Sequence, residues 1–416
     1  TYLVEGNLGY TGSENFNKER RYGWFPSISG GWVPTQYDWY RNLLPFNNFL
    51  KFRASWGRVG NDRLKDENGN DIRFPYLTTL GNVSSTWGTG LAENRTGSMN
   101  LKWEVSTKTN FGIDARFFDD KVDMTVDFFH TKTTDIFQRR ANIPDEGGLS
   151  NVLPYANIGS MKSWGMDGTL AYTHTFNKDM ALTVRGNFTH AENEVIYWEQ
   201  SGVNYPYQSN SGVPYKVQRG LIALGLFKDE DDIKSSPKQT FMDNYRPGDI
   251  KYKDVNGDGK IDKDDVVPLN YSAVPFIQYG FALDWNYKAF RVSILFEGVS
   301  KVQYFQGGRG FYPFLNESRG NLLEMVADPR NRWIPREYAE VNGIDPALAE
   351  NPNAKFPRLT YGENKNNNQE STFWLADGKY LRLKNVDVSY RFTNNWLKSR
   401  VGVESATLSL IGENLH

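Results

Sequence analysis

Apolar and polar positions alternate along residues 279–296, on either side of a two-residue turn at Lys288 and Ala289. Large apolar side chains occupy every second position from 279 to 287, and again from 290 to 296. A period of two places successive side chains on opposite faces of a β-strand. The segment therefore predicts a β-hairpin with one apolar, aromatic face and one polar face. A hairpin on a soluble core shows the same alternation, so this hairpin alone does not decide the fold class.

The same alternation recurs along most of the chain. It is found in residues 2–10, 50–56, 110–117, 122–128, 169–176, 182–188 and 381–392. Segments of about 10 residues or more are long enough for a tilted strand to cross a bilayer. Near the end of the chain the alternation slips by one position at Lys384 and Asn385, which predicts a β-bulge. We count about 11 to 13 strands in this way.

The connections between these segments fall into two classes. Short turns are expected at Asp119-Asp120, at 177–179 and at Lys288-Ala289, and the intervening connections are long. The long connections are expected near 132–163, 192–275 and 298–378. Outer-membrane barrels have short periplasmic turns at one end and long extracellular loops at the other. The pattern predicts an all-β fold, a transmembrane antiparallel β-barrel, and disfavours a large soluble all-β protein.

Composition agrees with a barrel. The 416 residues contain 15% aromatic residues, as interfacial aromatic girdles require, but only 39% hydrophobic residues, because a barrel strand has one apolar face. No apolar run is long enough for a transmembrane helix. A net charge of −1 argues against a nucleic-acid partner, and the absence of Cys excludes disulfides and thiol chemistry. No linker divides residues 1–416, and both ends lie close to a strand, so we expect a partial chain of a larger barrel.

A second motif lies within the 192–275 connection. Oxygen ligands fall at positions 1, 3, 5, 9 and 12 of a 12-residue loop, with glycine at position 6 and a backbone carbonyl at position 7. The positions are Asp254, Asn256, Asp258, Lys260 (through its carbonyl), Asp262 and Asp265. The spacing predicts a structural Ca²⁺ site, although position 12 carries Asp where Glu is usual. Because no helical pattern flanks the loop, a lone dockerin-like loop is the better comparison. The alternative is a solvated polar turn without a metal.

Enzymatic chemistry is not indicated. The four histidines are scattered, and three of them share the parity of apolar residues in their strands. Acidic pairs such as Glu192 and Glu194 could resemble the catalytic acid and base of a hydrolase. A glycosidase, however, needs two carboxylates at a defined separation, which the sequence does not show. No phosphate-binding loop or nucleophile elbow is present. We therefore expect a protein that is not an enzyme.

Several segments together resemble the SusC/RagA family of TonB-dependent transporters. The resemblance begins with Arg246-Pro-Gly-Asp-Ile-Lys-Tyr, followed by the 254–265 loop and then by Tyr279-Gly-Phe-Ala-Leu-Asp-Trp. Further matches lie at 25–32, 50–57, 377–384 and 412–415, in the family's order. The resemblance implies a 22-stranded barrel, of which this chain would be the C-terminal half. The family's plug, its TonB-contacting segment and its final strand have no counterpart in the chain.

The resemblance implies active import of nutrients across the outer membrane of a Bacteroidota-type bacterium. The implied cargo is an oligosaccharide, with a peptide as the second possibility. The implied partners are a SusD-like surface lipoprotein, TonB acting through a segment missing from this chain, and outer-membrane lipid. The alternative is a soluble or surface-attached β-rich carbohydrate-binding or adhesion protein with a dockerin-like calcium loop. Solubility in plain buffer would distinguish the two.

Individual residues can be assigned to these roles. Trp285 and Tyr287, beside a short turn, are expected in the periplasmic aromatic girdle, whereas Leu283, Ile294 and Val126 should face hydrocarbon. Loop aromatics could stack on sugar rings or pack against a lipoprotein, with ordinary loop packing as the alternative. These candidate contacts are Trp198, Tyr205, Tyr207, Phe311, Tyr312 and Trp374.

Overall fold

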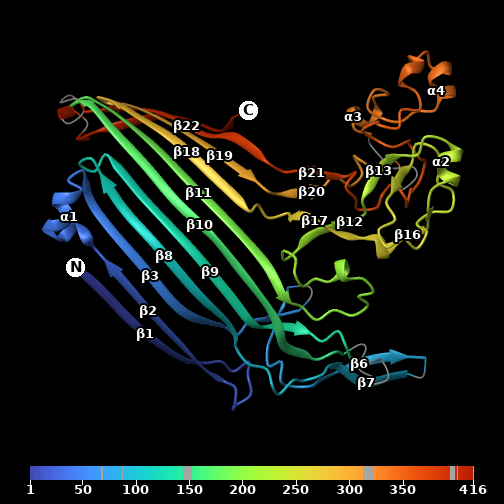
Figure 1. Ribbon diagram of the computed structural model, residues 1–416, viewed down its shortest axis with the longest axis horizontal. Coiled ribbons are helices and arrows are strands. Elements are labelled where there is room, and N and C mark those ends of the chain that lie inside the picture. Colours follow the sequence, from blue (N-terminus) through green and yellow to red (C-terminus); the bar gives the residue numbers. More distant parts are fainter. Residues whose placement is uncertain are drawn as a thin grey trace.

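The computed structural model describes residues 1–66, 69–86, 88–143, 152–312, 314, 322–393, 399–400 and 402–415. Eleven strands form one sheet in which each strand pairs with the next in chain order (Figure 1). All ten pairings are antiparallel. The strands are β1 (Tyr2–Gly12), β2 (Tyr22–Trp32), β3 (Asn47–Asn61), β8 (Glu104–Phe117), β9 (Val122–Arg139), β10 (Tyr155–Asn177), β11 (Met180–Tyr197), β18 (Ile277–Tyr287), β19 (Phe290–Ser300), β22 (Tyr380–Phe392) and β23 (Ala406–Leu415). The all-β, antiparallel prediction is confirmed.

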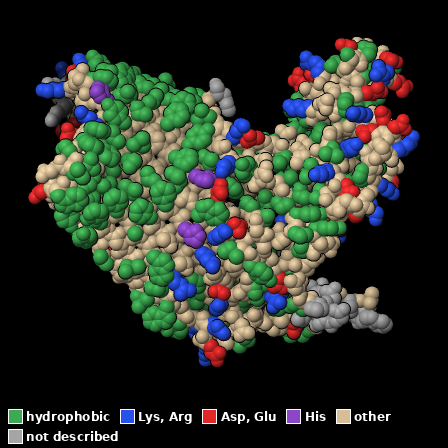
Figure 2. Space-filling view, viewed as in Figure 1, with side chains coloured by type: hydrophobic (Ala, Val, Ile, Leu, Met, Phe, Trp, Pro, Cys, Tyr) green, Lys and Arg blue, Asp and Glu red, His purple; other side chains and the backbone are tan. Residues whose placement is uncertain are grey.

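The register places the apolar positions of neighbouring strands on one face. Leu283 of β18 lies opposite Val184 of β11 and Ile294 of β19. Ile294 in turn lies opposite Val386 of β22, so the apolar set continues from strand to strand. In the space-filling view, hydrophobic side chains cover the sheet, whereas charged side chains gather over the loops on the right (Figure 2). The sheet thus has the two-faced character that its alternation predicts.

The predicted bulge in β22 is present at Lys384. Leu295 of β19 pairs with Asn385, but its neighbour Phe296 pairs with Leu383, so Lys384 is an extra residue on β22. The extra residue resets the alternation, and the large apolar residues on both sides of it keep the same face. It also allows Lys384 to lie 3.5 Å from the carboxylate of Glu297.

The connections separate by length between the two ends of the sheet. The predicted short turns are confirmed at 118–121, 178–179 and 288–289, and they lie at the upper left in Figure 1. The connection between β2 and β3 is on the same side and contains η1 (Pro34–Gln36) and α1 (Asp38–Leu43). The opposite end carries the connections 13–21, 62–103, 140–154, 198–276 and 301–379.

The predicted loop at 132–163 is wrong in its bounds. β9 continues to Arg139 and β10 begins at Tyr155, so the connection is only 140–154, and 144–151 lie outside the described residues. β10 has 23 residues, about twice the length that a barrel strand needs to cross a bilayer. The ends of these strands project beyond an apolar layer, and they therefore lack the alternation that identifies the rest. The other two predicted loops differ from the observed connections by only a few residues.

The remaining elements belong to the long connections. They are β4 (Leu64–Lys65), β5 (Asp71–Ile72), β6 (Thr79–Ser85), β7 (Gly88–Arg95), η3 (Pro206–Gln208), β12 (Val217–Gly220), β13 (Ala223–Leu226), α2 (Glu230–Lys234), β14 (Lys238–Gln239), β15 (Ile250–Tyr252), β16 (Lys260–Ile261), η4 (Lys263–Asp265), β17 (Val267–Ser272), β20 (Gln303–Phe305), α3 (Glu324–Ala327), α4 (Arg336–Val341), η5 (Pro346–Leu348) and β21 (Leu375–Asp377). No helix among the described residues has both the length and the apolar character needed to span a membrane.

Aromatic side chains gather at the short-turn end. The rings of Trp285 and Tyr287 are stacked with centroids 6.0 Å apart, beside the turn at 288–289. Tyr390 and Phe392, at the same end of β22, have centroids 4.7 Å apart. This arrangement supports the predicted girdle, since aromatic rings concentrate where an apolar layer meets water.

The two faces of β19 predict different responses to a new charge. We expect Ile294→Arg to lower the free energy of unfolding by about 2–4 kcal/mol, because the guanidinium would enter hydrocarbon. Ser293→Arg should cost much less, since Ser293 lies on the polar face between Asp284 and Asp387. Urea unfolding in lipid bilayers measures both, and equal costs would contradict the assigned faces.

Candidate functional site

The polar face of the sheet carries networks of paired charges. The carboxylate of Asp284, 6% exposed, lies 2.7 Å from the guanidinium of Arg185 and 3.1 Å from that of Arg291. These residues come from β11, β18 and β19, which are adjacent in the sheet. Both arginines are more than half exposed on the inner surface. The centre of this wall therefore presents two guanidinium groups held by one carboxylate.

A second network lies on the other half of the same face. Arg53 of β3 pairs with Asp114 of β8 at 2.8 Å and with Asp127 of β9 at 2.9 Å. Here one cation is held by two carboxylates, the reverse of the first network. Such a charged face is stable against water and would be costly against lipid. The two networks mark this face as the lining of an aqueous lumen.

The two longest connections, 198–276 and 301–379, fold together into what we call the loop module. It has its own hydrophobic core, separate from the sheet. The core consists of Leu221, Leu226, Ile250, Tyr252, Ile261, Val326, Trp333, Ala354, Phe356 and Trp374. Because residues of both connections contribute, neither can bury its apolar side chains without the other. The module is the largest structure at the long-loop end (Figure 1).

A buried carboxylate ties the two connections together. Asp249 is 0% exposed and lies 2.8 Å from Nε of Arg358. Its Oδ1 also accepts hydrogen bonds from Nδ2 of Asn364 at 3.0 Å and Nδ2 of Asn367 at 2.8 Å. Its Oδ2 accepts the backbone N–H of Arg246 at 2.8 Å. A buried charge is tolerated when it is paired and fully hydrogen-bonded, and Asp249 meets both conditions.

Side-chain amides complete this polar centre by pairing with β15. Asn367 Oδ1 accepts the backbone N–H of Ile250, and Gln239 Oε1 accepts that of Tyr252. Gln239 and Asn366 both donate to the carbonyl of Ile250 at 2.9 Å. The amides therefore satisfy a short buried strand that pairs with only one neighbour, β13, by backbone hydrogen bonds.

Sequence reasoning missed this polar centre. Its asparagines lie in the polar run 364–369, which has the composition of a solvated loop. In the sequence, the Pro247-Gly248-Asp249 turn stands out only as part of the segment 246–252 that carries the family resemblance. The separation of about 115 residues between the partners gives no local signal. A glycine-containing turn followed by an apolar strand was the one available indication of burial.

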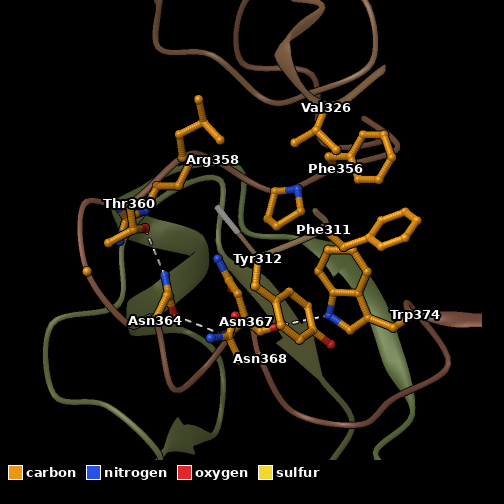
Figure 3. Close-up of a pocket in the computed structure, with 13 residues that line it drawn as sticks. Phe311, Tyr312, Val326, Phe356, Arg358, Thr360, Asn364, Asn367, Asn368 and Trp374 are labelled. Atoms are coloured by element: carbon orange, nitrogen blue, oxygen red, sulfur yellow. Dashed lines mark hydrogen bonds between the residues drawn. The ribbon is translucent and has the colours of Figure 1, made fainter. Parts of the chain in front are cut away.

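The cavity beside this centre is too small for cargo. It is lined by Phe311, Tyr312, Arg358, Asn364, Asn367 and Trp374, among others, and holds about 30 Å³ (Figure 3). That volume is on the order of one water molecule. Burial raises the pKa of Tyr312 to about 12, in keeping with its packed position. The cavity is the interior of the loop module.

Three of the predicted cargo contacts lie at this interior. Trp374 is 2% exposed, and its Nε1 donates to the carbonyl of Asn367 at 2.6 Å. Phe311 and Tyr312 pack against the same core. Trp374 is therefore a core residue whose indole closes the polar centre, which favours the loop-packing alternative; its contact with cargo stays a prediction. Phe311 and Tyr312 are half-buried, in line with the loop-packing alternative.

The other three predicted contacts lie outside that core. Trp198 packs near Tyr215, with ring centroids 6.0 Å apart. Tyr205 and Tyr207 are stacked at 5.5 Å, and the hydroxyl of Tyr207 donates to the carbonyl of Asp264 at 2.6 Å. All three are half-buried, so their contact with cargo stays a prediction.

The acidic loop is ordered by hydrogen bonds to its own backbone. Asp254 accepts the N–H groups of Gly257 and Gly259 at 2.6 and 2.9 Å. Asp265, which is 0% exposed, accepts those of Val255 and Asp262. Ile261 is 0% exposed and points inward, as the motif predicts. Gly259 has φ +81°, the conformation that favours glycine.

No group of three or more acidic, histidine or cysteine residues in the described chain converges as a metal site. Both carboxylate oxygens of Asp254 and of Asp265 already accept N–H groups. Calcium binding by this loop therefore stays a prediction. The acidic pair that resembles hydrolase carboxylates is held in ion pairs: Glu192 lies 3.0 Å from Lys301, and Glu194 lies 3.0 Å from Lys162.

The comparisons with known proteins agree with this geometry. A family model described as "TonB dependent receptor-like, beta-barrel" matches residues 2–415. TonB-dependent receptor P26 of Formosa agariphila is 27% identical over 97% of this chain, and this chain covers 39% of that protein. TonB-dependent receptor SusC of Bacteroides thetaiotaomicron is 23% identical over 95% of the chain and 37% of its own length. The chain thus spans about two fifths of these relatives.

Among solved structures, the RagAB peptide transporter has a similar fold. The match has a TM-score of 0.73 at 21% identity, and it covers 100% of this chain and 42% of the solved one. The RagAB peptide importer in its open-open state gives a TM-score of 0.74 at 20% identity. At this level of identity the likeness concerns the fold.

The role of Asp249 can be tested by its removal. We expect Asp249→Ala to destabilise the loop module by about 3–5 kcal/mol, because the half-buried Arg358 and two buried amides would lose their acceptor. Hydrogen exchange should speed up across 239–252 and 358–374 and stay unchanged in the sheet. Asp243→Ala, at an exposed position of the same connection, is the control. Unchanged exchange in Asp249→Ala would contradict the role assigned to this carboxylate.

Proposed function

The chain belongs to the TonB-dependent receptor-like β-barrel family, and on that premise we propose that it forms half of the barrel of an outer-membrane nutrient importer of the SusC/RagA type. The single observation that carries this proposal is the pair of unlike faces on one sheet. One face is apolar across adjacent strands, and the other holds the Asp284 and Arg53 networks. Only a closed barrel suits both faces, with lipid outside and water inside.

The mechanism follows from this two-sided wall. Cargo would enter from the long-loop end and descend along a polar lining that offers exposed guanidinium and carboxylate groups. Binding to such a lining must be strong enough for capture and weak enough for release. The driving energy would come from TonB, through segments that the present chain does not include. The chain's own contribution is the lipid-facing wall, the lumen lining and the outer loops.

We propose an oligosaccharide as the cargo, with a peptide as the second possibility. Similarity to SusC and to the RagAB peptide transporter supports membership in one transporter type without choosing between these cargo classes. We also propose a SusD-like lipoprotein as the partner on the long-loop end. A packed loop module there offers a fixed surface of the kind that a docking partner needs.

Uptake by living cells tests the import function. Deletion of the gene should abolish uptake of one labelled oligosaccharide pool, and the gene supplied on a plasmid should restore it. Deletion of TonB in the same cells should have the same effect, since the import is active. Recovery of the protein in the soluble fraction, or uptake that persists in both deletions, would contradict the proposal.

The calcium prediction can be tested independently of cargo. If the 254–265 loop binds a structural Ca²⁺, the ion would neutralise part of the charge on four aspartates. Calcium should then protect this loop from proteolysis in the parent protein and not in Asp258→Ala, and association with the lipoprotein should weaken in the variant. Heat resistance of the barrel should stay nearly unchanged in both.

Asp120→Ala, in a short turn at the opposite end of the sheet, is the matched control for that experiment. It should retain the calcium response of the parent. Equal proteolysis of the parent loop in calcium and in chelator would show that the loop is a metal-free turn.

A further inference from the structure

The loop module contains a second, larger cavity, which shares Arg358 and Leu359 with the first. We call it the arginine groove. Its volume is about 790 Å³, within the range of small-ligand sites. Its lining comes from residues 228–230 at the start of α2, the turn at 246–247, the stretch 332–338, Glu350 and residues 358–359. None of the residues predicted from sequence as cargo contacts lies in this groove.

Arg332 is a buried cation without a carboxylate partner. It is 8% exposed, and its Nε donates to the carbonyl of Ala327 at 3.1 Å. Its guanidinium carbon lies 5.3 Å from the ring centroid of Tyr338. Within the described residues no Asp or Glu pairs with it, whereas Arg358 pairs with Asp249. A buried charge is costly until an opposite charge pairs with it, and the groove leaves space for that charge to arrive with a ligand.

Trp333 adds an unused hydrogen-bond donor at the same place. It is 6% exposed, and its buried Nε1 has no acceptor among the described residues. Its ring lies against Gly248, where a Cβ would clash with the indole, so its position is fixed. Buried donors without acceptors are rare in stable structures. The groove thus combines an unneutralised cation and an unsatisfied donor on adjacent residues.

The charges around the groove leave an excess of positive groups. Lys228 and Arg246 are exposed and make no ion pair within the described residues. Of the acidic lining residues, Asp229 accepts N–H groups of α2, and Glu350 pairs with Arg336 at 3.1 Å. Hydrogen bonds from N–H groups leave the charge of Asp229 in place, so Asp229 and Glu230 together face three cations. The groove therefore favours an anion.

Two further features favour a sugar over a peptide. Tyr338 is 41% exposed, so it offers an aromatic face beside the guanidinium on which a pyranose ring could stack. Pro247 and Pro335 line the groove and have no N–H group to pair with an extended peptide backbone. We propose that the arginine groove binds an acidic sugar unit of an oligosaccharide, with Arg332 pairing its carboxylate and Tyr338 stacking on its ring. This inference rests on the proposed import function and specifies its cargo class.

Calorimetry on the full-length protein in detergent tests the groove, with trigalacturonate as the probe. We expect Arg332→Gln to weaken binding by about tenfold or more, since a charge-assisted hydrogen bond is lost. Arg330→Gln should bind as the parent does, because Arg330 is 76% exposed and pairs with Asp328 outside the groove. Equal losses in the two variants would overturn the proposal.

Two other probes test the charge and the ligand class. The methyl ester of trigalacturonate has the same shape without charge, and it should bind at least about tenfold more weakly than the acid. Triglutamate carries carboxylates on a peptide and should also bind more weakly. Equal binding of the ester would refute the ion pair, and equal or tighter binding of triglutamate would refute the sugar assignment.

Arg246→Gln is a second variant, which keeps the test valid if Arg332→Gln does not fold. Arg246 is exposed, so its loss should leave the heat-resistant barrel intact and still weaken trigalacturonate binding severalfold. Unchanged binding in a folded Arg246→Gln would count against the groove. Uptake of neutral oligosaccharides by cells, with no binding of trigalacturonate, would refute this inference and leave the import function standing.

Discussion

The fold depends on the need to pair every backbone N–H and C=O within an apolar layer. A strand in hydrocarbon has no water to replace a missing partner, so each strand must be hydrogen-bonded on both sides. Chain neighbours are the nearest partners, and the eleven strands accordingly pair in sequence order. The same constraint fixes the register, because a slip by one residue would turn Asp284 into lipid and Leu283 into the lumen. Where β22 does slip, at Lys384, the bulge restores the correct faces.

Beyond that layer the loops face a different requirement. In water, strand pairing is no longer obligatory, but a connection of about 80 residues must bury apolar side chains to be ordered. Connections 198–276 and 301–379 meet this by sharing one core. Asp249 and its asparagine partners lie at the centre, where short strands end and backbone groups would otherwise lack partners. Side-chain amides there supply the hydrogen bonds to backbone groups that neighbouring strands supply in the sheet.

This difference explains how far the sequence could be interpreted. Period-two alternation is local, so the hairpin at 279–296, the short turns and the bulge at Lys384 were predictable from neighbouring residues. β2 is harder to recognise as a strand, because Pro26 and the glycines at 23, 30 and 31 interrupt its alternation. The ends of β9 and β10 nearest the long loops read as loop in the sequence, because the alternation stops where the strands leave the apolar layer. The side-chain partners of Asp249 are more than 100 residues away, and no local pattern indicates such a contact.

Arg358 and Arg332 show that two arginines in one module can have different roles, one in the fold and one in binding. Arg358 is neutralised by Asp249, and its removal would leave a buried carboxylate, so its role in the fold is sufficient reason for its presence. Within the described residues, the side chain of Arg332 has a carbonyl and an aromatic ring as partners, both of which a neutral side chain could also contact. A fold that needed only packing at this position would gain by replacing the charge. The cost of keeping a buried cation beside an open groove is best explained by an anion that binds there.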